Sequence, residues 1–168
     1  MSVFYGGVDP GMSGAIAFIC RGGERLDIID MPVVAGQVSF GALIEKLEPY
    51  RAVDTMIYVE NVHAMPKQGV SSTFKFGMGF GGVLGVLAAR AFPYTRIEPS
   101  VWKRAVGLPA GAPKELSVKR AMEVFPQHAR LFVRPKLRGT GVIALDGRAE
   151  AALIALYGAR MLALGARP

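Results

Sequence analysis

The sequence has only one cysteine and two histidines, which restricts the chemistry open to it. Cys20 has no second cysteine for a disulfide, and no Cys/His spacing typical of a zinc site occurs. We therefore expect a protein of a reducing, cytoplasmic setting. No basic segment followed by a long apolar one opens the chain, so no secretory signal is expected. The apolar run 76–89 is shorter than the roughly 20 residues of a membrane span, so no membrane partner is expected.

Charged residues are also scarce, at 20% of the chain, whereas apolar residues make up 51%. This composition is typical of globular proteins and not of disordered ones. A chain of 168 residues can build one well-buried core but is too short for two ordinary domains. We expect a single domain over 1–168.

Acidic residues are fewer than basic ones, 13 against 20, and the net charge is +7. The imbalance is local. Residues 1–95 hold seven basic and eight acidic side chains, whereas 96–138 hold ten basic and three acidic. Lysine and arginine release the counterions condensed on a polyanion, so a basic third indicates a nucleic-acid partner. A solvated basic surface that aids solubility explains the charge equally well.

Short apolar runs and turn residues predict the secondary structure. We predict strands at 3–9, 15–20, 26–31, 56–60 and 94–98, and helices at 40–48, 71–91, 101–106, 113–125 and 146–164. The first three strands follow one another through short turns, so they should be antiparallel. This order predicts an α/β fold whose mixed sheet is flanked by helices. Residues 126–143, rich in proline, glycine and basic side chains, are predicted to be a mobile basic loop.

Four acidic residues lie at the ends of predicted elements. Asp9 and Glu60 each end an apolar strand, and functional groups gather at the carboxyl edge of such sheets. Asp146 and Glu150 are four apart and share one face of a helix. Carboxylates prefer Mg²⁺ or Mn²⁺. Two such ions about 4 Å apart can activate a water and stabilise the leaving oxygen of a phosphodiester.

Each acid also has an ordinary explanation. Asp9 can form a turn, Glu60 can point to solvent, and the Asp146–Glu150 pair can favour a helix N-terminus through its dipole. Four such acids in an otherwise basic protein are harder to explain in this way. The metal site is therefore the stronger hypothesis.

Three segments match a known family. The segments GVDPGMSGA (7–15), YVE (58–60) and DGRAEAAL (146–153) resemble, in order, the acidic motifs of RuvC-type Holliday junction resolvases, especially those of phage. These belong to the RNase H-like superfamily, and the resemblance extends over almost the whole chain. It implies a five-stranded mixed sheet whose first three strands are antiparallel.

The resemblance also implies an activity. The family consists of crossover junction endodeoxyribonucleases of DNA recombination and repair, which leave a 5′-phosphate and a 3′-hydroxyl. It implies two Mg²⁺ or Mn²⁺ ions per site, bound by Asp9, Glu60, Asp146 and Glu150. It further implies a homodimer through the glycine-rich helix 71–91, and packing of that helix on its own sheet is the less favoured alternative.

Lysines in the basic third match family positions as well. Lys103 and Lys114 correspond to lysines near the scissile phosphate, where they would be catalytic, and generic phosphate contact is the alternative. The segment 63–69 matches a loop that inserts an aromatic side chain at the junction centre. This chain has His63 and Met65 there. The predicted DNA-binding residues are Ser13, His63, Lys67, Lys75, Lys103, Arg104, Lys114, Lys119 and Arg138.

Two other functions stay open from the sequence. The chain could be an RNase H-fold nuclease of flap or single-stranded nucleic acid. It could instead be a non-catalytic nucleic-acid-binding module, although binding alone does not require four acids that repel DNA. An ATP-binding protein of the actin or sugar-kinase type needs a second domain, for which the chain is too short. The family also often spaces its last acidic pair three apart, whereas Asp146 and Glu150 are four apart.

Overall fold

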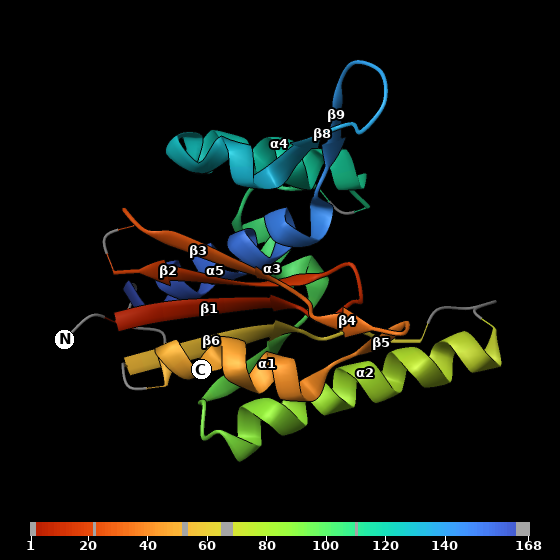
Figure 1. Ribbon diagram of the computed structural model, residues 1–168. Coiled ribbons are helices and arrows are strands. Elements are labelled where there is room, and N and C mark those ends of the chain that lie inside the picture. Colours follow the sequence, from red (N-terminus) through yellow and green to blue (C-terminus); the bar gives the residue numbers. More distant parts are fainter. Residues whose placement is uncertain (1–2, 22, 52–53, 65–68, 110, 164–168) are drawn as a thin grey trace.

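A five-stranded mixed sheet forms the centre of the computed structural model, which describes residues 3–21, 23–51, 54–64, 69–109 and 111–163 (Figure 1). The strand order is β3-β2-β1-β6-β7. The first three strands pair antiparallel, and β6 and β7 run parallel to β1. This confirms the predicted α/β sheet. The strands are β1 Val3–Asp9, β2 Ala15–Cys20, β3 Leu26–Asp30, β6 Asp54–Glu60 and β7 Tyr94–Ile97.

Helices cover both faces of this sheet (Figure 1). Side chains alternate along a strand, so Ile16 and Phe18 of β2 pack with one set of helices and Ala15 and Ala17 with the other. One face carries α1 (Phe40–Leu47), which leads into a 3-10 turn at Glu48–Tyr50, and α2 (Val70–Ala89). The other face carries α5 (Asp146–Ala163), α3 (Pro99–Ala105) and α4 (Lys114–Val124).

The α5 helix approaches β1 without any intervening side chain. A Cβ added to Gly7 would overlap the backbone of α5 at Ala151 and Ala155. A Cβ on Gly147 would likewise overlap the carbonyl of Ser13. Glycine at these two positions lets the helix backbone rest on the strand and on the loop that follows it. The first turn of α5 is thereby placed beside the carboxyl end of β1.

The segment 126–143 is not the irregular loop that its composition predicts. Residues Pro126–Phe132 form a 3-10 helix, and β8 (Val133–Pro135) pairs antiparallel with β9 (Val142–Ala144). The physical reason is a hydrophobic anchor, because Phe132 is fully buried at the start of the hairpin. The glycines that composition assigns to a loop make its turn, with positive φ at Gly139 and Gly141. A second small hairpin, β4 (Val33–Val34) with β5 (Gln37–Val38), is too short to show a sequence period.

The α2 helix is largely exposed despite its apolar sequence. Only Val83, Val86 and Leu87 are buried, whereas Phe74 is 68% exposed and Met78 49%. Within the described part of the chain, α2 is the one helix long and apolar enough, by length and composition only, to cross a membrane. Core helices of soluble proteins can have the same composition, so this feature is weak evidence for a membrane.

Candidate active site

Asp9 and Glu60 end two neighbouring strands of the sheet. β1 and β6 are parallel, with Val8 opposite Val59, so the acid that follows each valine lies at the same edge. The Asp9 carboxylate accepts a hydrogen bond of 3.1 Å from the Gly11 N–H, which holds the turn after β1. The strand pairing that the sequence suggested is therefore present.

Asp146 and Glu150 complete the acidic cluster from α5. Both lie on its first turns, and Glu150 is buried. The charges of Glu150 and Asp146 act on Asp9, and those of Asp9 and Glu150 act on Glu60. The structure thus brings together all four acids that the sequence singled out.

Two further helices supply partners for these carboxylates. Lys103 of α3 lies 3.3 Å from the Glu150 carboxylate, and Lys114 of α4 lies 2.5 Å from that of Asp146. Both predicted lysines are therefore in contact with the acidic cluster. They neutralise part of its charge.

Trp102 and Ser117 also contact the cluster, and sequence reasoning missed both. The Trp102 indole N–H donates a 3.0 Å hydrogen bond to Glu60, and the Ser117 hydroxyl donates one of 3.0 Å to Glu150. Both side chains are buried, so these bonds fix the rotamers of the two carboxylates. Helical spacing from Lys114 could have indicated Ser117, which is three residues further on.

Arg148 locks the start of α5 in place. Its guanidinium donates two hydrogen bonds of 2.6 Å to Asp30 at the end of β3, and a third of 3.1 Å to the carbonyl of Leu131. A two-pronged pair of this kind has a defined geometry. It holds Asp146 and Glu150, which flank Arg148 on the helix, against the sheet edge.

Burial makes the charged forms of two acids unfavourable. Desolvation is the main cause that raises the pKa of Asp9 to about 6, with the charge of Glu150 adding to it. Desolvation followed by the charges of Asp9 and Glu150 raises the pKa of Glu60 to about 7. The ion pair with Asp146 raises the pKa of Lys114 above its ordinary value. Bringing a cation to this cluster would relieve the repulsion.

Known structures share this architecture, although no protein-family model and no curated protein matches the sequence. RuvC of Thermus thermophilus, solved in complex with a Holliday junction substrate, aligns over 99% of this chain and 98% of its own, with 17% identity and a TM-score of 0.60. The chain has the RuvC fold. A further Thermus thermophilus RuvC structure aligns equally well. The yeast mitochondrial Holliday junction resolvase Ydc2 aligns over 96% of this chain and 78% of its own, with 14% identity and a TM-score of 0.59.

The donor set on this RuvC fold fits a divalent metal by its chemistry. Four carboxylates are hard oxygen ligands of the kind that Mg²⁺ and Mn²⁺ select. Among the residues that the structure describes, no three acidic, histidine or cysteine side chains are already arranged around one point as metal ligands. The lysine and serine contacts occupy oxygens of Asp146 and Glu150 instead. Lys103 and Ser117 both contact Oε1 of Glu150, and Lys114 contacts Oδ2 of Asp146.

The predicted DNA-binding residues on this RuvC fold divide by location. Ser13 is exposed in the loop after β1, and Arg104 is exposed on α3, directly after Lys103. Lys75 of α2 lines a groove with Pro10 and Met12, which follow Asp9 closely. Lys119 of α4 is exposed, and Arg138 lies on the exposed turn between β8 and β9. Lys67 and Met65 lie outside the described residues.

His63 is held by a polar partner. Its Nε2 lies 3.1 Å from the Glu98 carboxylate, which also accepts a 2.5 Å hydrogen bond from the Asn61 amide. These contacts tie the chain after Glu60 to the end of β7. His63 thus has a structural partner in addition to its predicted DNA contact.

The metal-free protein should become more stable as the pH falls from 8 to 5. The folded pKa values of Asp9 and Glu60, about 6 and about 7, exceed the ordinary values of 3.8 and 4.5. The folded state therefore holds protons that the unfolded state releases, so stability is greatest below the ordinary values and is lost as the pH rises through 6 to 7. Urea denaturation in EDTA at several pH values measures this. A double Asp9→Asn, Glu60→Gln variant should show a much flatter profile.

If the stability of the double variant rises as much as that of the wild type when the pH falls from 8 to 5, this explanation is wrong. Asp30, Glu48 and Glu98 have lowered pKa values, so their contribution is lost as the pH falls through those values. Stability measured between pH 5 and pH 8 therefore separates the effect of Asp9 and Glu60 from that of these three acids.

Proposed function

We propose that this chain is an endonuclease that cuts four-way (Holliday) or other branched DNA junctions by metal-dependent hydrolysis of phosphodiester bonds. The observation that carries the proposal is the convergence of four carboxylates and two lysines at one edge of a RuvC-type sheet. The Thermus thermophilus RuvC that shares this fold was solved with a Holliday junction substrate, which supports branched DNA as the partner.

The four acids would bind the metal, and the lysines would act on the DNA. Asp9, Glu60, Asp146 and Glu150 are proposed as ligands for two Mg²⁺ or Mn²⁺ ions. Bound there, the ions would supply an activated water and charge stabilisation for the leaving oxygen. Lys103 and Lys114, released from their carboxylates, would hold the scissile phosphate and offset its developing negative charge. Trp102 and Ser117 would keep Glu60 and Glu150 oriented.

The surrounding polar and basic side chains would hold the substrate. Phosphate contacts fix the position of a protein on DNA without reading its sequence. Lysine and arginine outside the acidic cluster are suited to that task. The proposed DNA-binding residues are Ser13, His63, Lys67, Lys75, Arg104, Lys119 and Arg138, together with the two lysines of the site.

A homodimer through α2 would allow paired cuts. Val70, Phe74 and Met78 are spaced by four residues, share one face of the helix and are exposed. Exposed apolar residues grouped in this way are typical of interaction surfaces. A two-fold dimer would place one site on each of two symmetric strands of a junction, acting on DNA in the cytoplasm.

Incubation with labelled DNA tests the proposal. With Mg²⁺ or Mn²⁺ we expect symmetric nicks in opposing strands of a four-way junction, little cutting of linear duplex, and no cutting in EDTA. A plasmid with an extruded cruciform should be linearised more often than nicked once, because paired sites cut both strands. An Arg21→Ala variant serves as the control, because Arg21 is exposed and lies beside Val3, at the end of β1 opposite Asp9.

Two results would go against the proposal. Equal cutting of flaps and single strands would favour a less selective RNase H-fold nuclease. No metal-dependent cutting of any substrate would leave a nucleic-acid-binding module.

A further inference from the structure

The β8–β9 hairpin projects from the fold as an arm on a fixed base. Residues 134–144 are all exposed, and Figure 1 shows the hairpin extending beyond α4. Its base is anchored, because Phe132 is fully buried and its carbonyl accepts a 2.9 Å hydrogen bond from the Leu145 N–H. A held base with an exposed tip is an arrangement suited to contact with another molecule.

The charge of this arm has one sign. No acidic residue occurs between Glu123 and Asp146, whereas Arg134, Lys136 and Arg138 all lie on the hairpin. The hairpin itself therefore carries no charge that would repel a polyanion.

The two faces of the hairpin differ in what they contact. Val133 pairs with Ala144 and Pro135 with Val142, and the valines and Ala144 line a hollow against α4. Side chains alternate along a strand, so Arg134, between Val133 and Pro135, belongs to the opposite face. That outer face is turned away from α4 and carries charge into solvent.

We propose that this arm binds in a groove of a duplex segment of the substrate, with Arg134, Lys136 and Arg138 on phosphates and Leu137 inside the groove. The proposal rests on the DNA substrate proposed above. A two-stranded ribbon fits the major groove of DNA. Leu137 is 96% exposed between two cations, so it packs against nothing within the fold.

The position of the arm sets where it would touch the DNA. β9 ends two residues before Asp146, so the base of the arm adjoins the acidic cluster. A strand rises about 3.3 Å per residue, which puts the turn roughly 20 Å from Asp146. With about 3.4 Å of helix axis per step of a DNA strand, this spans about six base pairs. The arm would therefore contact the duplex about six base pairs from the scissile phosphate.

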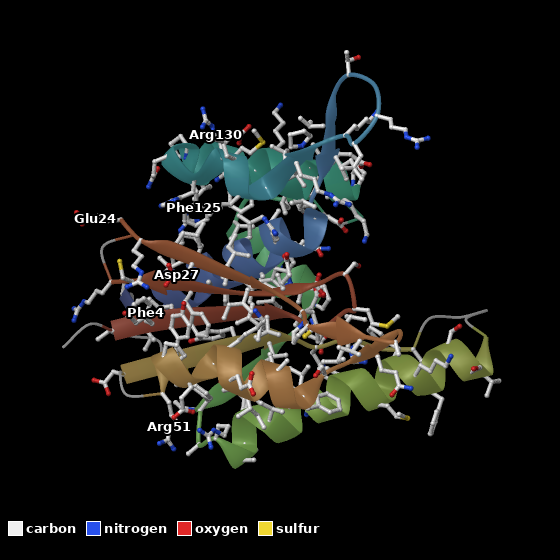
Figure 2. All side chains as sticks on the ribbon, in the orientation of Figure 1. Phe4, Glu24, Asp27, Arg51, Phe125 and Arg130 are labelled. Atoms are coloured by element: carbon white, nitrogen blue, oxygen red, sulfur yellow. The ribbon has the colours of Figure 1, made fainter. Side chains whose placement is uncertain are left out.

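Binding in EDTA tests the arm without any cleavage. We expect the triple variant Arg134→Ala, Lys136→Ala, Arg138→Ala to bind a four-way junction at least about tenfold more weakly than the wild type. The slope of log binding constant against log salt concentration should become shallower by about three, one for each lost phosphate contact. The matched control removes three exposed charges near the opposite end of the sheet, by Arg21→Ala, Arg25→Ala and Arg51→Ala (Figure 2 labels Arg51). The control should bind nearly as tightly as the wild type.

Crosslinking locates the contact. An Arg138→Cys variant in a Cys20→Ser background, carrying a photoactivatable group, should crosslink to duplex about six base pairs from the predicted cut. The proposal would be wrong if both triple variants weakened DNA binding equally, or if the crosslinks were scattered along the DNA. If the wild type binds linear duplex as tightly as four-way junctions, the proposed junction selectivity is wrong. The arm can still be tested in that case, because the salt dependence of duplex binding still shows whether its three cations contact phosphates.

Discussion

Replacing Glu60 with glutamine should lower metal-dependent cleavage by about three orders of magnitude and, at the same time, stabilise the metal-free protein. The first effect follows because an amide is a poorer metal ligand, and metal ions supply several kcal/mol of transition-state stabilisation. The second follows because the pKa of Glu60 is raised from 4.5 to about 7. At pH 8 the buried charge therefore costs about 3 kcal/mol, which glutamine removes.

Single-turnover cleavage and urea denaturation in EDTA measure the two effects. Glutamine can still accept the Trp102 hydrogen bond, so the surroundings of residue 60 are retained. Glu45→Gln, on the exposed side of α1, is the control and should change neither quantity much. Full cleavage activity in Glu60→Gln would show that Glu60 is not a metal ligand. Unchanged stability at pH 8 would mean that its charge is not unfavourable in the fold.

Gly7→Val should disrupt the site from a position that carries no functional group. Any side chain here would overlap the backbone of α5 at Ala151 and Ala155, so the helix must move away from β1. Overpacking of this kind costs about 3 kcal/mol or more. Asp146 and Glu150 would move with α5, away from Asp9 and Glu60. Thermal unfolding should show the loss of stability, and calorimetric titration with Mn²⁺ should show weaker metal binding.

Gly41→Ala is the matched control for this substitution. Gly41 lies in α1, and a Cβ there would meet nothing within 4 Å. Alanine should therefore stabilise the protein slightly, by up to about 1 kcal/mol, through its helix propensity. If Gly7→Val melts at the wild-type temperature, the close approach of α5 to β1 is not as tight as described.

The sequence predicted the strands and the acids because each has a local signature. An apolar run that stops at an acid marks Asp9 and Glu60, and a spacing of four marks Asp146 and Glu150. The sheet order follows from short turns between the first strands and long connections between the later ones. These features depend on neighbours in the chain, which a single sequence displays.

The partners of the acids could not be predicted in the same way. Trp102 meets Glu60 across 42 residues, and Arg148 meets Asp30 across 118. Nothing in the local pattern of an arginine or tryptophan indicates a partner so distant. The β8–β9 hairpin was missed for a related reason. Its strands are three residues each, and buried Phe132, not a sequence period, anchors them.

The contact between Gly7 and α5 also divides the site into parts that can change independently. The acids belong to a sheet and a helix whose backbones touch, whereas Lys103 and Lys114 belong to α3 and α4. Substitutions at exposed positions of these two helices, such as Arg104 and Lys119, can therefore alter the charge presented to a substrate while Trp102 and Ser117 still orient the acids. In an engineering programme, substrate preference could be varied at those exposed positions and the acidic cluster left untouched.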